Sequence, residues 1–139
     1  KVCKRWCRED YSVSKHGFCI KFHTTTRPRA DAELFCQSEG GHLMNPDTKE
    51  RWLDQENILK VHNNYYFYVD GIRRKAPGPW SFVKGSNPIT NGVVQWYKIQ
   101  PTNGNTEFCI MGRYIDGKLY WWDDFCSHKL RSVCEIRMN

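Results

Sequence analysis

The apolar and polar positions of this chain change period several times, which predicts a mixed α and β domain. Cys7 and Cys19 flank a segment with a turn at His16-Gly17, and strand-like residues follow, so we expect a β-hairpin at the start of the domain. A polar connection over residues 24–29 is expected next, and a helix after it. The apolar face of this helix and its end are marked by Ala32, Phe35, Cys36 and the pair Gly40-Gly41.

A second helix is predicted after Asn45-Pro46, with Asp47 as its N-cap and Glu50 at the capping-box position. Its later turns carry apolar and polar residues together, namely Trp52, Leu53, Glu56 and Leu59. A helix with such a mixed face fits packing against a sheet.

The rest of the chain predicts four strands around one long loop. Residues 65–72 form the run richest in β-forming side chains and are expected to be a central strand. Three shorter strands are expected over residues 108–114, 118–122 and 131–136. Residues 73–106 are rich in proline and glycine, yet they contain Trp80, Phe82, Val94 and Trp96. We therefore expect a functional loop that is ordered by a small aromatic core of its own.

Length and cysteine content indicate one extracellular domain over residues 1–139. The seven cysteines form no Cys-x-x-Cys pair or zinc-like cluster, so disulfides and secretion are expected. An odd count leaves one sulfur over. Cys3, in a short extension over residues 1–6, is expected to form an interchain bridge and give a dimer, either a homodimer or a pair with a related chain. No apolar run is long enough to cross a bilayer and no signal-peptide core is present, which predicts a mature soluble form without membrane insertion.

The net charge of +6 and the pI near 9.0 favour acidic partners, although diffuse charge more often serves solubility. The basic residues are scattered over residues 4–5, 27–29 and 73–75 rather than gathered in one stripe. No base-reading motif accompanies them, so we expect no nucleic-acid binding.

Candidate binding residues gather near the C-terminal end of the long loop. Gln100-Pro101-Thr102 forms a surface turn, Glu107 follows, and Trp121-Trp122-Asp123-Asp124 precedes Cys126. Amide, hydroxyl and carboxylate oxygens suit a hydroxylated ligand or a hard cation such as Ca²⁺. Because neighbouring strand residues point to opposite faces, only one of Trp121 and Trp122 is expected to be free to stack on a ligand.

The same residues argue against catalysis. Asp123 and Asp124 are adjacent in a predicted strand and point apart, which defeats the facing carboxylates that glycoside hydrolysis needs. Four of the five histidines have no partner at metal or catalytic-triad spacing and are expected to be ordinary, namely His23, His42, His62 and His128. We therefore expect a binding protein rather than an enzyme.

Set in order, several motifs resemble the long form of the C-type lectin-like domain over nearly the whole chain. They are the N-terminal cysteine pair, Ala32-x3-Cys36 followed by Gly40-Gly41-x-Leu43, Val69-Asp70-Gly71-Ile72, Trp80-x-Phe82, Trp96, Cys109, and Cys126-x7-Cys134 with Glu135 after it. The resemblance implies an α+β fold with two helices packed on small antiparallel sheets, a long loop region and three intrachain disulfides. The implied pairs are Cys7–Cys19, Cys36–Cys134 and Cys109–Cys126.

The resemblance also implies a sugar site in the long loop. Its residues here would be Gln100, Thr102, Glu107, Trp122, Asp123 and Asp124, with Gln100, Glu107, Asp123 and Asp124 as Ca²⁺ ligands. Thr102 stands where the family has a carboxylate or amide. Counting back from Cys126 places Trp122 at the usual Asn of the Trp-Asn-Asp motif, whereas a one-residue deletion would align Trp122-Asp123-Asp124 and keep both ligands. Arg29 stands where the family usually has a tryptophan.

The implied function is that of a secreted carbohydrate-binding lectin of innate immunity, with weakened or absent calcium dependence. Gln100 favours galactose or N-acetylgalactosamine. The alternative is a calcium-free lectin-like domain that binds a protein, a mineral or an anionic surface.

Overall fold

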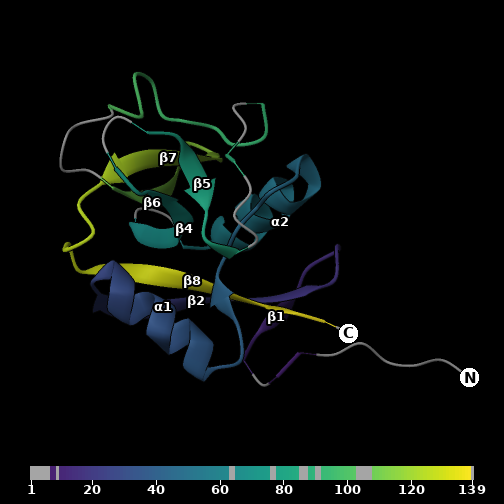
Figure 1. Ribbon diagram of the computed structural model, residues 1–139. Coiled ribbons are helices and arrows are strands. Elements are labelled where there is room, and N and C mark those ends of the chain that lie inside the picture. The colour runs from purple at the N-terminus through teal and green to yellow at the C-terminus, as the bar shows by residue number, and fades with distance from the viewer. Residues whose placement is uncertain are drawn as a thin grey trace, which may run out of the picture.

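The computed structural model describes residues 7–8, 10–62, 65–75, 78–84, 88–89, 92–102 and 108–138 (Figure 1). Within these ranges the chain forms two helices and eight sheet strands. In chain order they are β1 (Ser12–Val13), β2 (Phe18–Arg27), α1 (Arg29–Ser38), β3 (His42–Leu43), α2 (Lys49–Leu59), β4 (Phe67–Arg73), β5 (Trp80–Phe82), β6 (Cys109–Ile115), β7 (Lys118–Asp124) and β8 (Leu130–Arg137).

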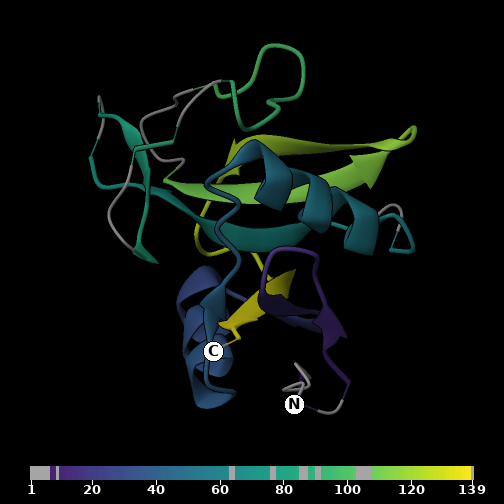
Figure 2. The same cartoon turned by 90° about the vertical axis from the view of Figure 1, so that its right-hand side faces the viewer.

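The strands form one sheet whose main path runs β1-β2-β8-β4-β6-β7, with β3 beside β8 and β5 beside β4. The β4–β8 pair is parallel and the other strand pairs are antiparallel. Helix α1 packs beside β3 and β8 at one end of the molecule, and α2 lies against the strands at the other end (Figures 1 and 2). The β4 strand is central, as the sequence predicts.

Two apolar clusters cover the sheet. The larger one centres on Trp121, which is fully buried, and includes Phe67, Val69, Ile110 and Leu119. The smaller one surrounds the Cys36–Cys134 bridge. The long-loop side chains Trp80, Phe82, Val94 and Trp96 are buried or partly buried, but they belong to or pack against the larger cluster. Phe82 and Trp96 contact the Trp121 ring, and Trp80 contacts Trp96. The expectation of a separate loop core is therefore wrong, because the loop aromatics complete the main core.

The three intrachain disulfides are confirmed. Cα–Cα distances are 5.5 Å for Cys7–Cys19, 5.4 Å for Cys36–Cys134 and 5.2 Å for Cys109–Cys126, all within the ordinary range. The Cys36–Cys134 bridge spans 98 residues. On the chain-entropy account, closing a loop of that length stabilises the fold by about 4 to 5 kcal/mol.

Several element boundaries differ from the sequence prediction. Strand β2 continues to Arg27 through a bulge, because residues expected to be a polar connection pair with β8. The N-cap of α2 is Thr48 rather than Asp47, since the Thr48 hydroxyl accepts the Arg51 N–H at 3.2 Å. Strands β3 and β5 were not expected, because two or three residues carry too little periodicity to be seen. Neither described helix has the length and apolar character of a membrane span.

Candidate functional site

The end of the long loop lies alongside β7. The Trp121 N–H donates to the Gln95 carbonyl at 2.9 Å, and the Tyr97 N–H donates to the Trp121 carbonyl at 3.0 Å. The chain then turns, with the Gln100 N–H bonded to the Tyr97 carbonyl at 2.8 Å, and continues through a cis Gln100-Pro101 bond. This path brings the Gln100-Pro101-Thr102 turn beside the C-terminal end of β7, where the aromatic and acidic block lies.

Thr102 and Asp123 meet at this point. The Thr102 hydroxyl donates towards both carboxylate oxygens of Asp123, at 3.0 and 3.1 Å. Asp123 is only 4% exposed, because its side chain lies on the inner side of β7 with Leu119 and Trp121. The site therefore contains a carboxylate held at a fixed position by a neutral hydroxyl.

Gln100 adds an oxygen of a different kind. Its side-chain Oε1 is buried and has no hydrogen-bond partner among the residues that the structure describes. A buried carbonyl oxygen without a partner is costly, so a ligand group, a water molecule or an ion that reaches this atom would complete its bonding. Glu107, which the sequence also placed here, lies outside the described residues.

The other two candidates of β7 lie on its opposite side. Asp124 is bonded to His128 Nδ1 at 3.0 Å and is largely buried. Trp122 stacks on Tyr97 with a centroid distance of 4.6 Å and an interplanar angle of 27°. Trp121 and Trp122 thus point to opposite faces as predicted, and the structure does not bring Asp124 to Thr102.

The described residues supply only part of a calcium shell. Ca²⁺ takes six to eight oxygens, and Gln100, Thr102 and Asp123 offer an amide oxygen, a hydroxyl and one carboxylate. Trp122 presents a ring rather than an oxygen next to Asp123. No group of three or more His, Cys, Asp or Glu side chains able to hold a metal occurs within the described ranges. These residues alone do not fit a strong calcium site.

Comparison with known proteins places the fold in a family. Residues 25–136 match the family described as Lectin C-type domain. The chain belongs to this C-type lectin domain family. It is 30% identical over 142 residues to mouse asialoglycoprotein receptor 1, covering 98% of the chain and 47% of the receptor. It is also 30% identical over 137 residues to the hemolymph lipopolysaccharide-binding protein of Periplaneta americana, covering 92% and 52%. The chain thus spans about half the length of these relatives.

Solved structures agree on the fold. The C-type lectin domain of murine dendritic cell inhibitory receptor 2, solved in complex with an N-glycan, has a TM-score of 0.82 at 18% identity, covering 95% of this chain and 99% of that one. A calcium-independent type II antifreeze protein has a TM-score of 0.80 at 20% identity, with both chains fully covered. Identities at this level show a common fold and no more.

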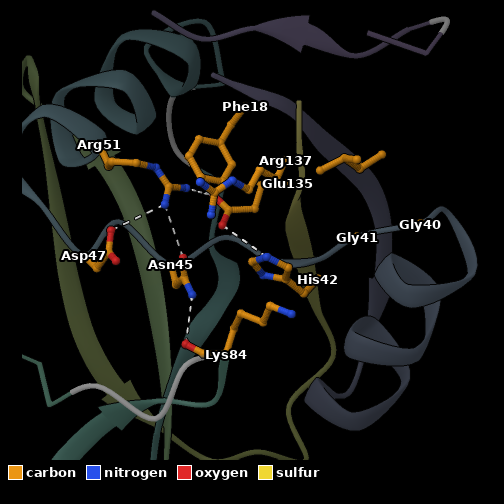
Figure 3. A pocket seen from close by; sticks show the side chains of 11 residues that line it. Phe18, Gly40, Gly41, His42, Asn45, Asp47, Arg51, Lys84, Glu135 and Arg137 are labelled. Atoms are coloured by element: carbon orange, nitrogen blue, oxygen red, sulfur yellow. Dashed lines mark hydrogen bonds and ion pairs between the residues drawn. The ribbon is translucent and has the colours of Figure 1, made fainter. Parts of the chain in front are cut away.

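A cavity of this lectin domain, with a volume of about 470 Å³, lies between the start of α2 and β8 (Figure 3). The Arg51 guanidinium lies 3.5 Å from the centre of the Phe18 ring, and it pairs with Asp47 at 3.4 Å and with Glu135. Glu135 also lies 3.4 Å from His42 Nε2. Burial raises the pKa of Glu135 to about 8, an effect that Arg51 partly offsets.

The cavity wall continues into a buried polar cluster. Asp70 accepts the Lys84 backbone N–H at 2.9 Å and the Asn45 side-chain amide at 3.3 Å, and it lies 3.5 Å from the Arg29 guanidinium. Burial raises the pKa of Asp70. These polar groups bond to one another and join the start of α2 to the sheet, which indicates a structural role. Sequence reasoning missed the cluster, although a charged Asp70 inside a predicted central strand was a visible signal.

Proposed function

We propose that this chain is a carbohydrate-binding lectin domain that recognises sugar hydroxyls through Gln100, Thr102 and Asp123. The observation that carries this proposal is the Thr102–Asp123 pair, together with the buried Oε1 of Gln100 in the same turn, which has no hydrogen-bond partner among the described residues. Membership of the C-type lectin domain family supports carbohydrate as the ligand class.

The chemistry of the three side chains matches a sugar. A sugar hydroxyl both donates and accepts, so one hydroxyl can donate to Gln100 Oε1 while a neighbouring one donates to the Asp123 carboxylate. Such a ligand would relieve the cost of an amide oxygen that has no partner within the described part of the chain. Gln100 favours galactose or N-acetylgalactosamine, as the resemblance of its turn implies.

Calcium contributes weakly in this proposal. Thr102 provides a neutral hydroxyl where the family has a stronger ligand. When positions are counted back from Cys126, Trp122 provides a ring where the family has the Asn ligand of the Trp-Asn-Asp motif. That alignment is the one we adopt, because Asp123 faces Thr102 whereas Asp124 is bonded to His128. Glu107 would supply a further carboxylate. With so few charged oxygens, calcium affinity in the millimolar range is expected.

The remaining parts of the proposal concern the setting of the domain. Disulfides persist in oxidising compartments, so the three bridges favour a secreted or otherwise extracellular domain, as an innate-immunity lectin would be.

Cys3, which lies outside the described residues, would link two chains. Two linked sites would raise a weak single-site affinity through avidity. We propose no catalytic activity, because Asp123 and Asp124 lie on opposite sides of β7.

A second candidate function is a calcium-free lectin-like domain that binds a protein, a mineral or an anionic surface. The observation that favours it is the incomplete set of calcium ligands in the described residues. A calcium-independent type II antifreeze protein shares this fold over the full length of both chains, which is compatible with this candidate.

A glycan array separates the two candidates. Wild type and Asp123→Asn are applied with calcium and with chelator, and Asp54→Asn serves as the matched control, since Asp54 is a buried carboxylate of α2 that pairs with His16. We expect binding of a defined sugar class that is lost in Asp123→Asn and retained in Asp54→Asn. If no glycan binds under either condition, the lectin proposal is overturned.

A further inference from the structure

The outer face of β6 and β7 carries a row of aromatic rings. Met111 pairs with Trp122 and Arg113 pairs with Tyr120 across the two strands, so these four side chains share one face. Tyr97 packs against this face from the long loop, with centroid distances of 4.6 Å to Trp122 and 5.3 Å to Tyr120. The inner residues of β7 point the other way into the core.

The row extends past β6 towards the start of β4. The Tyr66 ring lies 6.1 Å from the Trp122 ring in an edge-on arrangement. Arg113 Nη1 donates to the Tyr66 hydroxyl at 2.8 Å, and its guanidinium lies 4.7 Å from the centre of the Tyr66 ring. We call Tyr66, Tyr97, Tyr120 and Trp122 the aromatic strip. Tyr66 is 36% exposed and the other three rings are half-buried, so the strip is accessible and well supported.

Positive charge lies at both sides of the aromatic strip. Arg113 stands beside Tyr66, and the Lys98 ammonium lies 5.1 Å from the centre of the Tyr97 ring. Lys98 is exposed. The whole chain has a net charge of +6, which strengthens the attraction of an anion. Flat rings flanked by cations are complementary to a ligand with apolar ring faces and negative substituents.

We propose that the aromatic strip binds an acidic polysaccharide, with sugar rings stacked on Trp122 and Tyr97 and sulfate or carboxylate groups at Arg113 and Lys98. The strip is distinct from the Gln100, Thr102 and Asp123 site, because Trp122 and Asp123 point to opposite sides of β7. The inference rests on the proposed function only in taking carbohydrate as the ligand.

The arrangement explains why the strip suits a polymer. Several rings span three segments of the chain, so consecutive sugars can each find an apolar face, and aromatic stacking tolerates different sugars. The planar guanidinium of arginine can offer paired donors to two oxygens of a sulfate or a carboxylate, whereas lysine acts as a point charge. A short neutral sugar would gain only one stacking contact and no ion pair.

The test compares binding of three polymers of similar length, namely dextran sulfate, polygalacturonate and neutral dextran, at physiological ionic strength. The strip variants are Lys98→Gln with Arg113→Gln, and Trp122→Leu. The control is Lys15→Gln with Arg137→Gln, which also removes two positive charges. These two residues lie near the β1–β2 hairpin, at the opposite end of the sheet path. Thermal unfolding of each variant verifies that it is folded.

We expect both strip variants to weaken binding of dextran sulfate by about ten-fold or more, and the control pair by less than about two-fold. Preferential binding of one acidic polymer identifies sulfate or carboxylate as the recognised group. Asp123→Asn should retain acidic-polymer binding even where it abolishes binding of small neutral sugars, so the two sites can fail separately. Equal weakening by the strip and control pairs means non-specific attraction. A non-covalent dimer of the Cys3→Ser protein that Trp122→Leu dissociates means that the strip is a self-interface. Either result overturns the proposal.

Discussion

Thr102 and Asp123 are 21 positions apart in sequence, yet the Thr102 hydroxyl lies 3.0 and 3.1 Å from the two carboxylate oxygens of Asp123. Thr102 belongs to the turn near the end of the long loop, and Asp123 belongs to the end of β7. A hydroxyl donor therefore occupies the carboxylate that a cation would otherwise share. This relationship underlies the expected weak calcium affinity of the site.

Replacing Thr102 by Asp is expected to raise calcium affinity. A second carboxylate beside Asp123 repels it in the absence of metal, and both would ligate Ca²⁺, so affinity should increase by roughly ten-fold or more. Calorimetric titration of calcium measures the change. Thr102→Val is the control, since it removes the hydroxyl without adding charge. Equal calcium affinities for wild type and Thr102→Asp would show that the metal does not bind here.

Truncation of Trp80 should destabilise the whole domain. Trp80 is 9% exposed, lies 5.9 Å from the Trp96 ring and belongs to the main core. Trp80→Ala should lower the free energy of unfolding by about 3 to 5 kcal/mol. Urea unfolding followed by intrinsic fluorescence and by circular dichroism should give coincident transitions. Leu53→Ala, at a residue that is 59% exposed, should have little effect. Separate transitions would instead show that the loop is an independent unit.

Stability should fall as pH rises through the neutral range because of Glu135. Its pKa is raised by burial from the ordinary value of 4.5 to about 8 in the folded protein. Between these values the folded state retains a proton that the unfolded state releases, so the free energy of unfolding decreases with increasing pH. Urea unfolding at several pH values from 5 to 8 measures the slope of the free energy of unfolding against pH.

Glu135→Gln should flatten that slope, whereas His42→Gln, which removes the neighbouring imidazole, should retain it. The groups that face Glu135 are Arg51, His42, Asp47 and Asp70. An unchanged slope in Glu135→Gln would assign the pH dependence to another of these groups.

Cys3 should link two chains. The other six cysteines pair within the chain, which leaves its sulfur over. Electrophoresis without reductant should show a band at about twice the chain mass of 16.5 kDa, and reductant or Cys3→Ser should abolish it. A monomer band from unreduced wild type would contradict this prediction.

Much of the fold was predictable because the signals are local or covalent. The apolar face of α1, the β-forming run of β4 and the cysteine spacing each specify an element or a bridge. The N-cap of α2 was misplaced by one residue, since Asp47 and Thr48 can both cap and only the three-dimensional path selects Thr48. The pairing of β2 beyond Phe22 depends on β8, which lies far away in sequence.

The site was only partly predictable for a similar reason. The alternation of side chains along β7 correctly predicts that Trp121 and Trp122 point to opposite faces of the strand. The partners of Asp123 and Asp124 come from other segments, namely Thr102 and His128, and no spacing rule reveals them. The Arg51–Glu135 pair joins α2 to β8 across 84 positions and was equally hidden.

The central claim is that sugar binds at Gln100, Thr102 and Asp123 with little help from calcium. Calorimetric titration of calcium into wild type and Asp123→Ala, with sugar affinity measured in each and in chelator, tests it most directly. The account predicts millimolar or absent calcium binding by wild type, with sugar affinity intact in chelator and lost in Asp123→Ala. Micromolar calcium affinity that disappears in Asp123→Ala, together with loss of sugar binding in chelator, would contradict it.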